Sequence, residues 1–293
     1  MSSAPEVSIE RAYFRIGDLT VCVDAPPYPV SERLNAYRCE PVPAPDRRLT
    51  VRAVPQVTAP EQILLRKTGI TEFHDPQGGR TLFCQREDGA GLLYKAAEQG
   101  DAVTVDYAAD CLNGLSSHLI LRWLELPRTL LKRDELFLHA SYIAFEGKAI
   151  LFTAPKQTGK STQARLWEQY RGAEPINGDR ALLREEDGLW YACGSPFCGS
   201  SNLCKNRTLP LAAIVILRQG AKNAVAQANE RQALLSFLEG VTYDVNDRSA
   251  MDKVMTLAQR IKECVPFYAL TCLPDEGAVA CLHNRLIEEG IYG

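Results

Sequence analysis

The segment LFTAPKQTGKSTQARLW, residues 151–167, decides how this chain of 293 residues is interpreted. Its second half, Gly159-Lys160-Ser161-Thr162, has the residues that a nucleotide-phosphate loop (P-loop) needs, although Ala154 stands where the pattern G-x-x-x-x-G-K-[ST] has its first glycine. The apolar run before the loop predicts a strand, and STQARLWEQY after it predicts a helix. This context favours a phosphate-binding loop over a chance match.

The chemistry of such a loop is specific. A tight turn between strand and helix points backbone N–H groups at the phosphates, and the helix N-terminus adds a partial positive charge. The lysine then reaches the β- and γ-phosphates, and the following hydroxyl helps to hold Mg²⁺. We therefore expect ATP and Mg²⁺ as cofactors. The residues expected around the nucleotide are Ala154, Pro155, Lys156, Gln157, Thr158, Gly159, Lys160, Ser161 and Thr162.

The alanine at position 154 weakens the motif without destroying it. Pro155 favours an extended conformation at Ala154, because a residue before proline avoids the α region. An extended alanine costs little, whereas a positive φ would cost about 1 kcal/mol or more. The neighbouring Lys156 either contacts phosphate or faces solvent.

Composition excludes several classes of protein. A hydrophobic fraction of 46% and a charged fraction of 24% are typical of a globular domain. The net charge of −3 argues against a general nucleic-acid-binding surface. No apolar run reaches the roughly 18 residues of a membrane span, and MSSAPEVSIERAYF does not have the form of a secretory signal. From the sequence we expect a cytoplasmic protein without membrane or nucleic-acid partners.

The ten cysteines favour reduced thiols over a structural framework. None forms a C-x-x-C pair, and most lie inside apolar runs, which is typical of buried free cysteine. Cys193, Cys198 and Cys204 surround a loop, so a zinc site is an alternative there, although no fourth ligand is evident.

The chain divides into two parts by its pattern of apolar residues. Residues 1–125 alternate short apolar runs with turn signals and predict a β-rich N-terminal region, with a helix over 112–124 at its end. Residues 126–293 alternate strands with helices around the loop, which is typical of an α/β domain. The predicted strands there are 137–145, 148–154, 181–193 (a hairpin), 211–217 and 267–273, and the predicted helices are 161–170, 230–239, 248–264 and 276–289.

Several motifs in the second part resemble a known family. His139 in FLHAS, the loop itself and NGDR at 177–180 resemble the catalytic domain of HPr kinase/phosphorylase. That P-loop domain is related in fold to phosphoenolpyruvate carboxykinase. The closer resemblance is to HPr kinase-like proteins encoded near bacterial peptide-modification genes, which carry a G-x-P-x-x-G segment that residues 194–199 match. The resemblance covers roughly residues 130–290 and implies phosphoryl transfer from ATP to a serine hydroxyl, with self-association into a homo-oligomer.

The resemblance assigns roles to individual residues. Lys160 would bind phosphate, Ser161 and Asp179 would bind Mg²⁺, and His139 would take or orient the proton of the acceptor hydroxyl. The family usually has two adjacent aspartates where this chain has Gly178-Asp179, so one carboxylate is missing. The structural alternatives are a core histidine at 139 and a turn or capping carboxylate at 179.

The acceptor is less well defined. CGSPFCGSSNLCKNR, residues 193–207, places Gly199, Lys205 and Arg207 where they could contact an acceptor; the alternative is a solvated loop. The leading hypothesis is an ATP-dependent kinase acting on a serine of a peptide or small protein. The alternatives are a catalytically weak nucleotide-binding module with a regulatory or scaffold role in peptide maturation, and a small-molecule kinase.

Overall fold

The computed structural model describes residues 7–58, 69–74, 80–88 and 91–293, and it is a mixed α/β structure with two sheets. The chain divides into two compact units, residues 1–126 and 127–293, which we call the N-terminal and C-terminal units. None of the described helices combines the length and the apolar character that crossing a bilayer requires.

The N-terminal unit is built on a seven-stranded sheet of order β1-β2-β3-β7-β6-β5-β4 among its described residues. Its strands are β1 (Glu10–Ile16), β2 (Leu19–Ala25), β3 (Arg47–Val54), β4 (Ile70–His74), β5 (Arg80–Gln85), β6 (Leu92–Gln99) and β7 (Ala102–Ala108). In β6, buried and partly buried residues alternate, as expected for a strand with one face on a core. The helical elements are α1 (Glu32–Asn35), η1 (Ala109–Gly114) and α2 (Ser117–Leu124).

Helix α2 packs on this sheet through Trp123. The indole makes edge-to-face contacts with Tyr94 and Tyr107, at centroid distances of 5.1 and 5.9 Å. The prediction of one continuous helix over 112–124 is wrong. The 3₁₀ helix η1 ends at Gly114, and Leu115 and Ser116 are extended before α2 begins. Glycine is a poor helix former and serine favours the position before a helix, so the chain breaks there.

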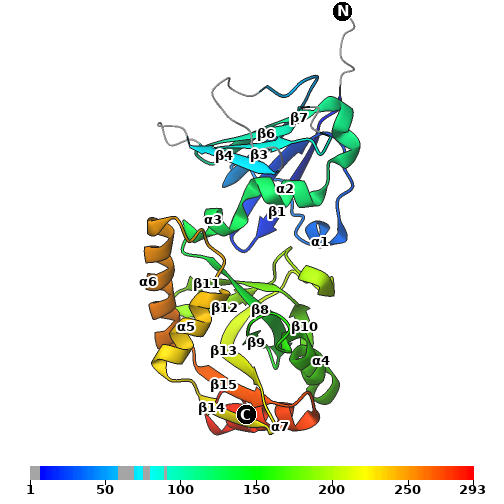
Figure 1. Ribbon diagram of the computed structural model, residues 1–293. Helices are drawn as coiled ribbons and strands as arrows, with labels where there is room; N and C mark the ends of the chain where they lie inside the picture. Colours follow the sequence, from blue (N-terminus) through cyan, green and yellow to red (C-terminus); the bar gives the residue numbers. More distant parts are fainter. Residues whose placement is uncertain (1–6, 59–68, 75–79, 89–90) are drawn as a thin grey trace, which may run out of the picture. The chain divides into compact units, whose positions relative to one another are not determined.

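The C-terminal unit contains an eight-stranded sheet with helices on both sides (Figure 1). Its strands are β8 (Leu136–Phe145), β9 (Lys148–Thr153), β10 (Glu174–Asn177), β11 (Arg180–Glu186), β12 (Leu189–Cys193), β13 (Thr208–Gln219), β14 (Ala224–Gln227) and β15 (Phe267–Cys272). Its helical elements are α4 (Lys160–Arg171), η2 (Gly199–Ser201), α5 (Glu230–Gly240), α6 (Arg248–Cys264) and α7 (Glu276–Glu288), and the short α3 (Leu126–Leu131) lies at the division between the units.

Strand β13 organises this sheet. It pairs in parallel with β9 on one side and with β15 on the other, so the carboxyl ends of the three strands meet at one edge. The loop of residues 154–159 leaves β9 at that edge and leads into α4. The side-chain amide of Gln219, at the end of β13, donates a hydrogen bond to the carbonyl of Gln157 at 3.4 Å.

Strand β8 pairs with three other strands. Its first four residues pair with β11 and its remaining six pair with β9, while residues 142–144 also pair with β10 on the other side. His139 is therefore the fourth residue of a ten-residue strand. Since Ala140 pairs with Thr153, the last residue of β9, His139 lies just beyond the point where β9 stops.

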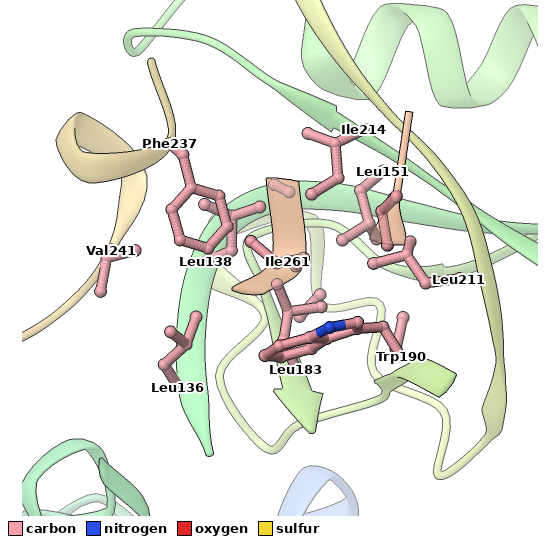
Figure 2. Packing of buried hydrophobic residues seen from close by; sticks show 14 of the residues in the cluster. Leu136, Leu138, Leu151, Leu183, Trp190, Leu211, Ile214, Phe237, Val241 and Ile261 are labelled. Carbon is pink, nitrogen blue, oxygen red and sulfur yellow. The ribbon is translucent and has the colours of Figure 1, made fainter. Parts of the chain in front are cut away.

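The two faces of the sheet carry separate hydrophobic clusters. Alternate residues of β13 enter each cluster: Ile214 and Ile216 pack with residues of α5 and α6, while Val215 and Leu217 pack with residues of α4 and α7. Figure 1 shows α5 and α6 on one side of the sheet and α4 on the other. Members of the first cluster, among them Phe237 and Leu138, are shown in Figure 2.

The packing of α4, the helix that follows the loop, depends on Trp167. Its ring is fully buried and makes an edge-to-face contact with Phe145 at a centroid distance of 5.2 Å. Trp167→Ala is expected to reduce the free energy of unfolding by about 3–5 kcal/mol through the cavity that it leaves. The matched control Leu189→Ala, at a position 59% exposed, should stay within about 0.5 kcal/mol. The change in the free energy of unfolding of each variant is measured by hydrogen exchange of peptides from β8 and β9. Equal destabilisation by the two substitutions would contradict the assigned packing of Trp167.

Candidate functional site

The loop of residues 154–159 places its left-handed backbone positions away from Ala154. Among the described residues of the loop, positive φ values occur at Gln157 (63°) and Gly159 (115°). Alanine is therefore not strained at 154, and the absence of a glycine there does not prevent the turn. Gln157 takes a conformation that costs a non-glycine residue about 1 kcal/mol or more.

The side chain of Lys160, the first residue of α4, folds back onto the loop. The residue is 7% exposed, and its ammonium donates to the carbonyls of Ala154 at 2.8 Å and Pro155 at 3.1 Å. The hydroxyl of Thr158 also donates to Pro155, at 2.9 Å. Burial lowers the pKa of Lys160; the carboxylate of Asp179 acts in the opposite direction. The loop therefore wraps around a positive charge that is largely removed from water.

The start of α4 has the properties of an anion site. Gly159 is its N-cap and provides no side-chain cap, and the first turn contains no acidic residue. The first N–H groups of a helix have no partner within the helix, and the dipole of a helix of 12 residues is positive at this end. Ser161, which is exposed, and Thr162, which is half-buried, belong to this first turn.

A buried asparagine holds the turn that carries Asp179. The side-chain oxygen of Asn177 accepts the backbone N–H groups of Asp179 and Arg180, both at 2.9 Å. Its amide nitrogen donates to the carbonyl of Ser195 at 2.9 Å, and the residue is 1% exposed. Asn177 was not among the residues predicted for the site. The string Asn-Gly-Asp could have indicated its role, because an asparagine side chain often forms a hydrogen bond with the backbone two residues further on.

Asp179 and His139 form the contact that defines the site. Nδ1 of His139 lies 3.0 Å from the carbonyl oxygen of Asp179 and 3.3 Å from its carboxylate oxygen Oδ1. Both neighbours are acceptors, so Nδ1 carries a proton, and in the neutral form of the ring Nε2 has the lone pair. Nε2 is buried and has no hydrogen-bond partner among the described residues. His139 is thus oriented with an unsatisfied acceptor atom, which a satisfied core histidine would not have.

The charge environment keeps Asp179 ionised. The hydrogen bond from His139 is the main cause of the lowered pKa of Asp179, and Arg180 and Lys160 act in the same direction. Arg180 Nε lies 3.6 Å from the carboxylate and forms an ion pair with it. The charges of Lys160 and Asp179 affect each other's pKa, so the loop and the Asp179 turn share one electrostatic environment.

The space beside Gly178 is occupied by Ser201. A Cβ atom at position 178 would lie 2.7 Å from Cβ of Ser201 and closer still to its hydroxyl oxygen. That hydroxyl donates to the carbonyl of Cys198 at 2.7 Å. At Gly199, an added Cβ would lie 3.0 Å from Cγ of Asp179. The segment from Gly199 to Ser201 therefore packs directly on the turn that carries Asp179, and Gly199 is brought to the site.

Lys205 and Arg207 both pair with Glu174 and not with Asp179; the ammonium of Lys205 lies 2.8 Å from the Glu174 carboxylate. Glu174 is the first residue of β10, and Asn177 is the last. The hydrogen bond from Lys205 is the main cause of the lowered pKa of Glu174. The structure thus gives these two cations a carboxylate partner of their own instead of placing them at Asp179.

The cysteines differ from their expected environment. All ten are reduced thiols, but only Cys22, Cys193 and Cys198 are fully buried, and Cys264 is exposed. Among the described residues, no group of three or more His, Cys, Asp or Glu side chains is placed to hold a metal ion.

Comparison with known proteins gives distant similarity to solved structures only. No family model matches the chain, and no curated protein matches it. Among solved structures, the HPr(Ser) kinase/phosphatase from Coxiella burnetii aligns with 11% identity, covering 53% of this chain and 98% of its own, with a TM-score of 0.31. A similarity at this level carries no argument about the site, which depends on the contacts described above.

The packing of Ser201 on Gly178 predicts coupling between the two positions. Gly178→Ala should destabilise the C-terminal unit by about 1–3 kcal/mol, because the new methyl group overlaps Ser201. Ser201→Gly removes the overlapping atoms, so the double variant should recover at least about 1 kcal/mol of that loss. Denaturant unfolding of the four proteins measures the coupling. Additive effects would show that Ser201 does not occupy this space.

The lowered pKa of Asp179 predicts a pH dependence. A carboxylate whose pKa is lower in the folded state stabilises the protein above its ordinary value of 3.8, and this contribution is lost as the pH falls through the lower folded value. Wild type should therefore exceed Asp179→Asn in stability near neutral pH, and the difference should shrink as the pH falls below 3.8. Thermal unfolding across this range measures it. A difference independent of pH would exclude the ionised carboxylate as its cause.

Proposed function

We propose that the C-terminal unit is an ATP-dependent kinase that transfers the γ-phosphoryl group to a hydroxyl, with a serine of a peptide or small protein as acceptor. One observation carries the proposal. The buried Lys160 at the uncapped start of α4 shares its electrostatic environment with Asp179. The carboxylate of Asp179 contacts the imidazole of His139, whose Nε2 has no hydrogen-bond partner among the described residues. Phosphate binding and proton transfer are thus combined at one edge of one sheet.

The residues fit a nucleotide and its metal ion. The uncapped first turn of α4 and the buried ammonium of Lys160 suit the phosphates, together with the backbone N–H groups that the 156–162 segment offers. Ser161 and Asp179 would hold Mg²⁺; one hydroxyl and one carboxylate are enough, because Mg²⁺ takes its remaining ligands from phosphate and water. When bound, the ion neutralises charge on the phosphate oxygens.

His139 would remove the proton from the acceptor hydroxyl. Its Nδ1–H is held by Asp179, which orients the ring and leaves Nε2 as the base. The ionised Asp179 also stabilises the imidazolium that forms, because its carboxylate lies 3.3 Å from Nδ1. General-base assistance of this kind contributes about 10²–10⁴-fold to the rate, so its loss would slow transfer without abolishing nucleotide binding.

A second function is favoured by the position of Ser201. Because Ser201 fills the space beside Gly178, the site has a single carboxylate, Asp179, on this turn. Nε2 of His139 is also enclosed. Both features suit a nucleotide-binding module with weak transfer and a regulatory or scaffold role in peptide maturation. A small-molecule kinase would use the same phosphate site with a different acceptor. Gly199, which packs on Asp179, is the proposed acceptor contact at the site; Lys205 and Arg207, which pair with Glu174, would contact the acceptor only away from Asp179.

Separate measurements of ATP binding and transfer distinguish these functions. With γ-labelled ATP, Mg²⁺ and serine-containing peptides, wild type should transfer label. Lys160→Met should lose both ATP binding and transfer, because it removes the ammonium group that would contact the phosphates. His139→Gln should keep binding and lose about 10²–10⁴-fold in transfer rate. The control Arg165→Ala, on the exposed side of α4, should change neither.

The possible outcomes separate the alternatives. ATP binding without transfer to any hydroxyl would favour the binding module. Transfer to small alcohols but not to peptides would favour the small-molecule kinase. Unchanged binding in Lys160→Met would contradict the phosphate site itself.

A further inference from the structure

We propose that Cys198 and Cys204 form a reversible disulfide, a modification site that closes the segment lying on Asp179. Their sulfur atoms are 2.9 Å apart in the reduced protein. Five residues separate the two cysteines along the chain, and these are the residues that pack on the Gly178-Asp179 turn. A bond between the sulfurs would therefore join the two ends of this segment.

Both ends of the segment are held in place before any bond forms. Cys204 forms a β-bridge with Asn177, and the next N–H, that of Lys205, donates to the carbonyl of Ile176 at 2.9 Å. Cys198 is 1% exposed and follows Phe197, whose ring packs edge-to-face on Phe137 at 5.4 Å. These anchoring contacts lie on β10 and β8, so the two thiols are already held close together before any bond forms.

The residues between the cysteines contact the functional turn. Gly199 lies against the carboxylate of Asp179, and Ser201 occupies the space beside Gly178. The backbone N–H of Gly178 donates to the carbonyl of Leu203 at 3.3 Å. Without the disulfide, the contacts of Gly199, Ser201 and Leu203 hold this segment on the turn. With the disulfide formed, a covalent bond also joins its two ends, and the segment becomes a small ring.

The chemistry is thiol–disulfide exchange with a small disulfide such as oxidised glutathione. Cys204 is the more exposed of the two, so its thiolate attacks the small disulfide, forms a mixed disulfide and releases one thiolate. The Cys198 thiolate then attacks the Cys204 sulfur and releases the second thiolate. Two protein thiols are oxidised and one disulfide is reduced to two thiols, with the two protons passing to the released thiolates.

The effect on activity rests on the proposed function. An acceptor hydroxyl that reaches His139 and Asp179 must approach a carboxylate on which Gly199 lies. A fixed segment should therefore block transfer, while the loop of residues 154–159 stays able to bind nucleotide. Oxidation is expected to lower transfer and to leave ATP binding unchanged.

Peptide mapping of the full chain tests the disulfide directly. The protein is equilibrated with mixtures of reduced and oxidised glutathione, quenched with acid, alkylated and digested without reduction. We expect a peptide linked through Cys198 and Cys204, lighter by two hydrogen atoms, which disappears on reduction. Cys264, which is exposed, serves as the control and should give a glutathione adduct instead. If Cys198 and Cys204 are alkylated independently in every mixture, the proposal is overturned.

Transfer and ATP binding are then measured on the same samples. Reversible loss of transfer in the oxidised protein, absent in Cys204→Ala, supports the regulatory role; Cys198→Ser is a second variant if the first does not fold. A linked peptide with unchanged transfer overturns that role. If the reduced protein shows no transfer at all, the proposed kinase function fails, while the linked peptide still decides whether the disulfide forms.

Discussion

The site depends on the hydrogen bonds that the buried side chain of Asn177 makes in two directions. Its oxygen accepts from the turn that carries Asp179, and its amide donates to Ser195 in the following loop. Ser195 is itself fully buried, and its hydroxyl donates to the carbonyl of Arg180 at 2.6 Å. One amide therefore sets both the position of the carboxylate and the path of the loop that returns to it. Losing it would leave several buried groups unsatisfied at once.

Charge compensation explains why polar groups are tolerated at this edge. Lys160 is buried, which disfavours its charged form, and Asp179 partly offsets that cost. Asp179 in turn is stabilised as an anion by His139, Arg180 and Lys160. Each group makes the ionisation of the next less costly, so the set acts as a unit. Removing Asp179 would lower the pKa of Lys160 further, in addition to deleting the contacts of the carboxylate.

Local signals in the sequence predicted the elements that carry the site. The apolar run of 148–154 and the glycine-lysine motif located β9 and the start of α4, because both depend on neighbouring residues only. The continuous apolar run of 211–217 similarly indicated a strand covered on both faces, which β13 is. These residues determine which elements form and which edge the loop occupies.

Contacts between distant segments could not be predicted in the same way. The position of His139 within β8 follows from the change of partner from β11 to β9 after this residue, and the string FLHAS does not contain that information. The break after Gly114 was visible only as a weak preference against a helix. The orientation of the His139 ring was also hidden, since its proton location follows from two acceptors of Asp179, which lies 40 residues away.

Gly178 shows how a local change in sequence has a structural cause at a distance. Its missing side chain looks like a lost functional group when the chain is read alone. In the structure, the same absence makes room for Ser201, just as the absence at Gly199 makes room for Asp179. Two glycines on facing segments thus permit one close contact: a side chain at 178 would overlap Ser201, and a side chain at 199 would crowd the side chain of Asp179. Any carboxylate at 178 would therefore require a different path for residues 198–204. The single carboxylate of this turn and the covering segment are one structural constraint.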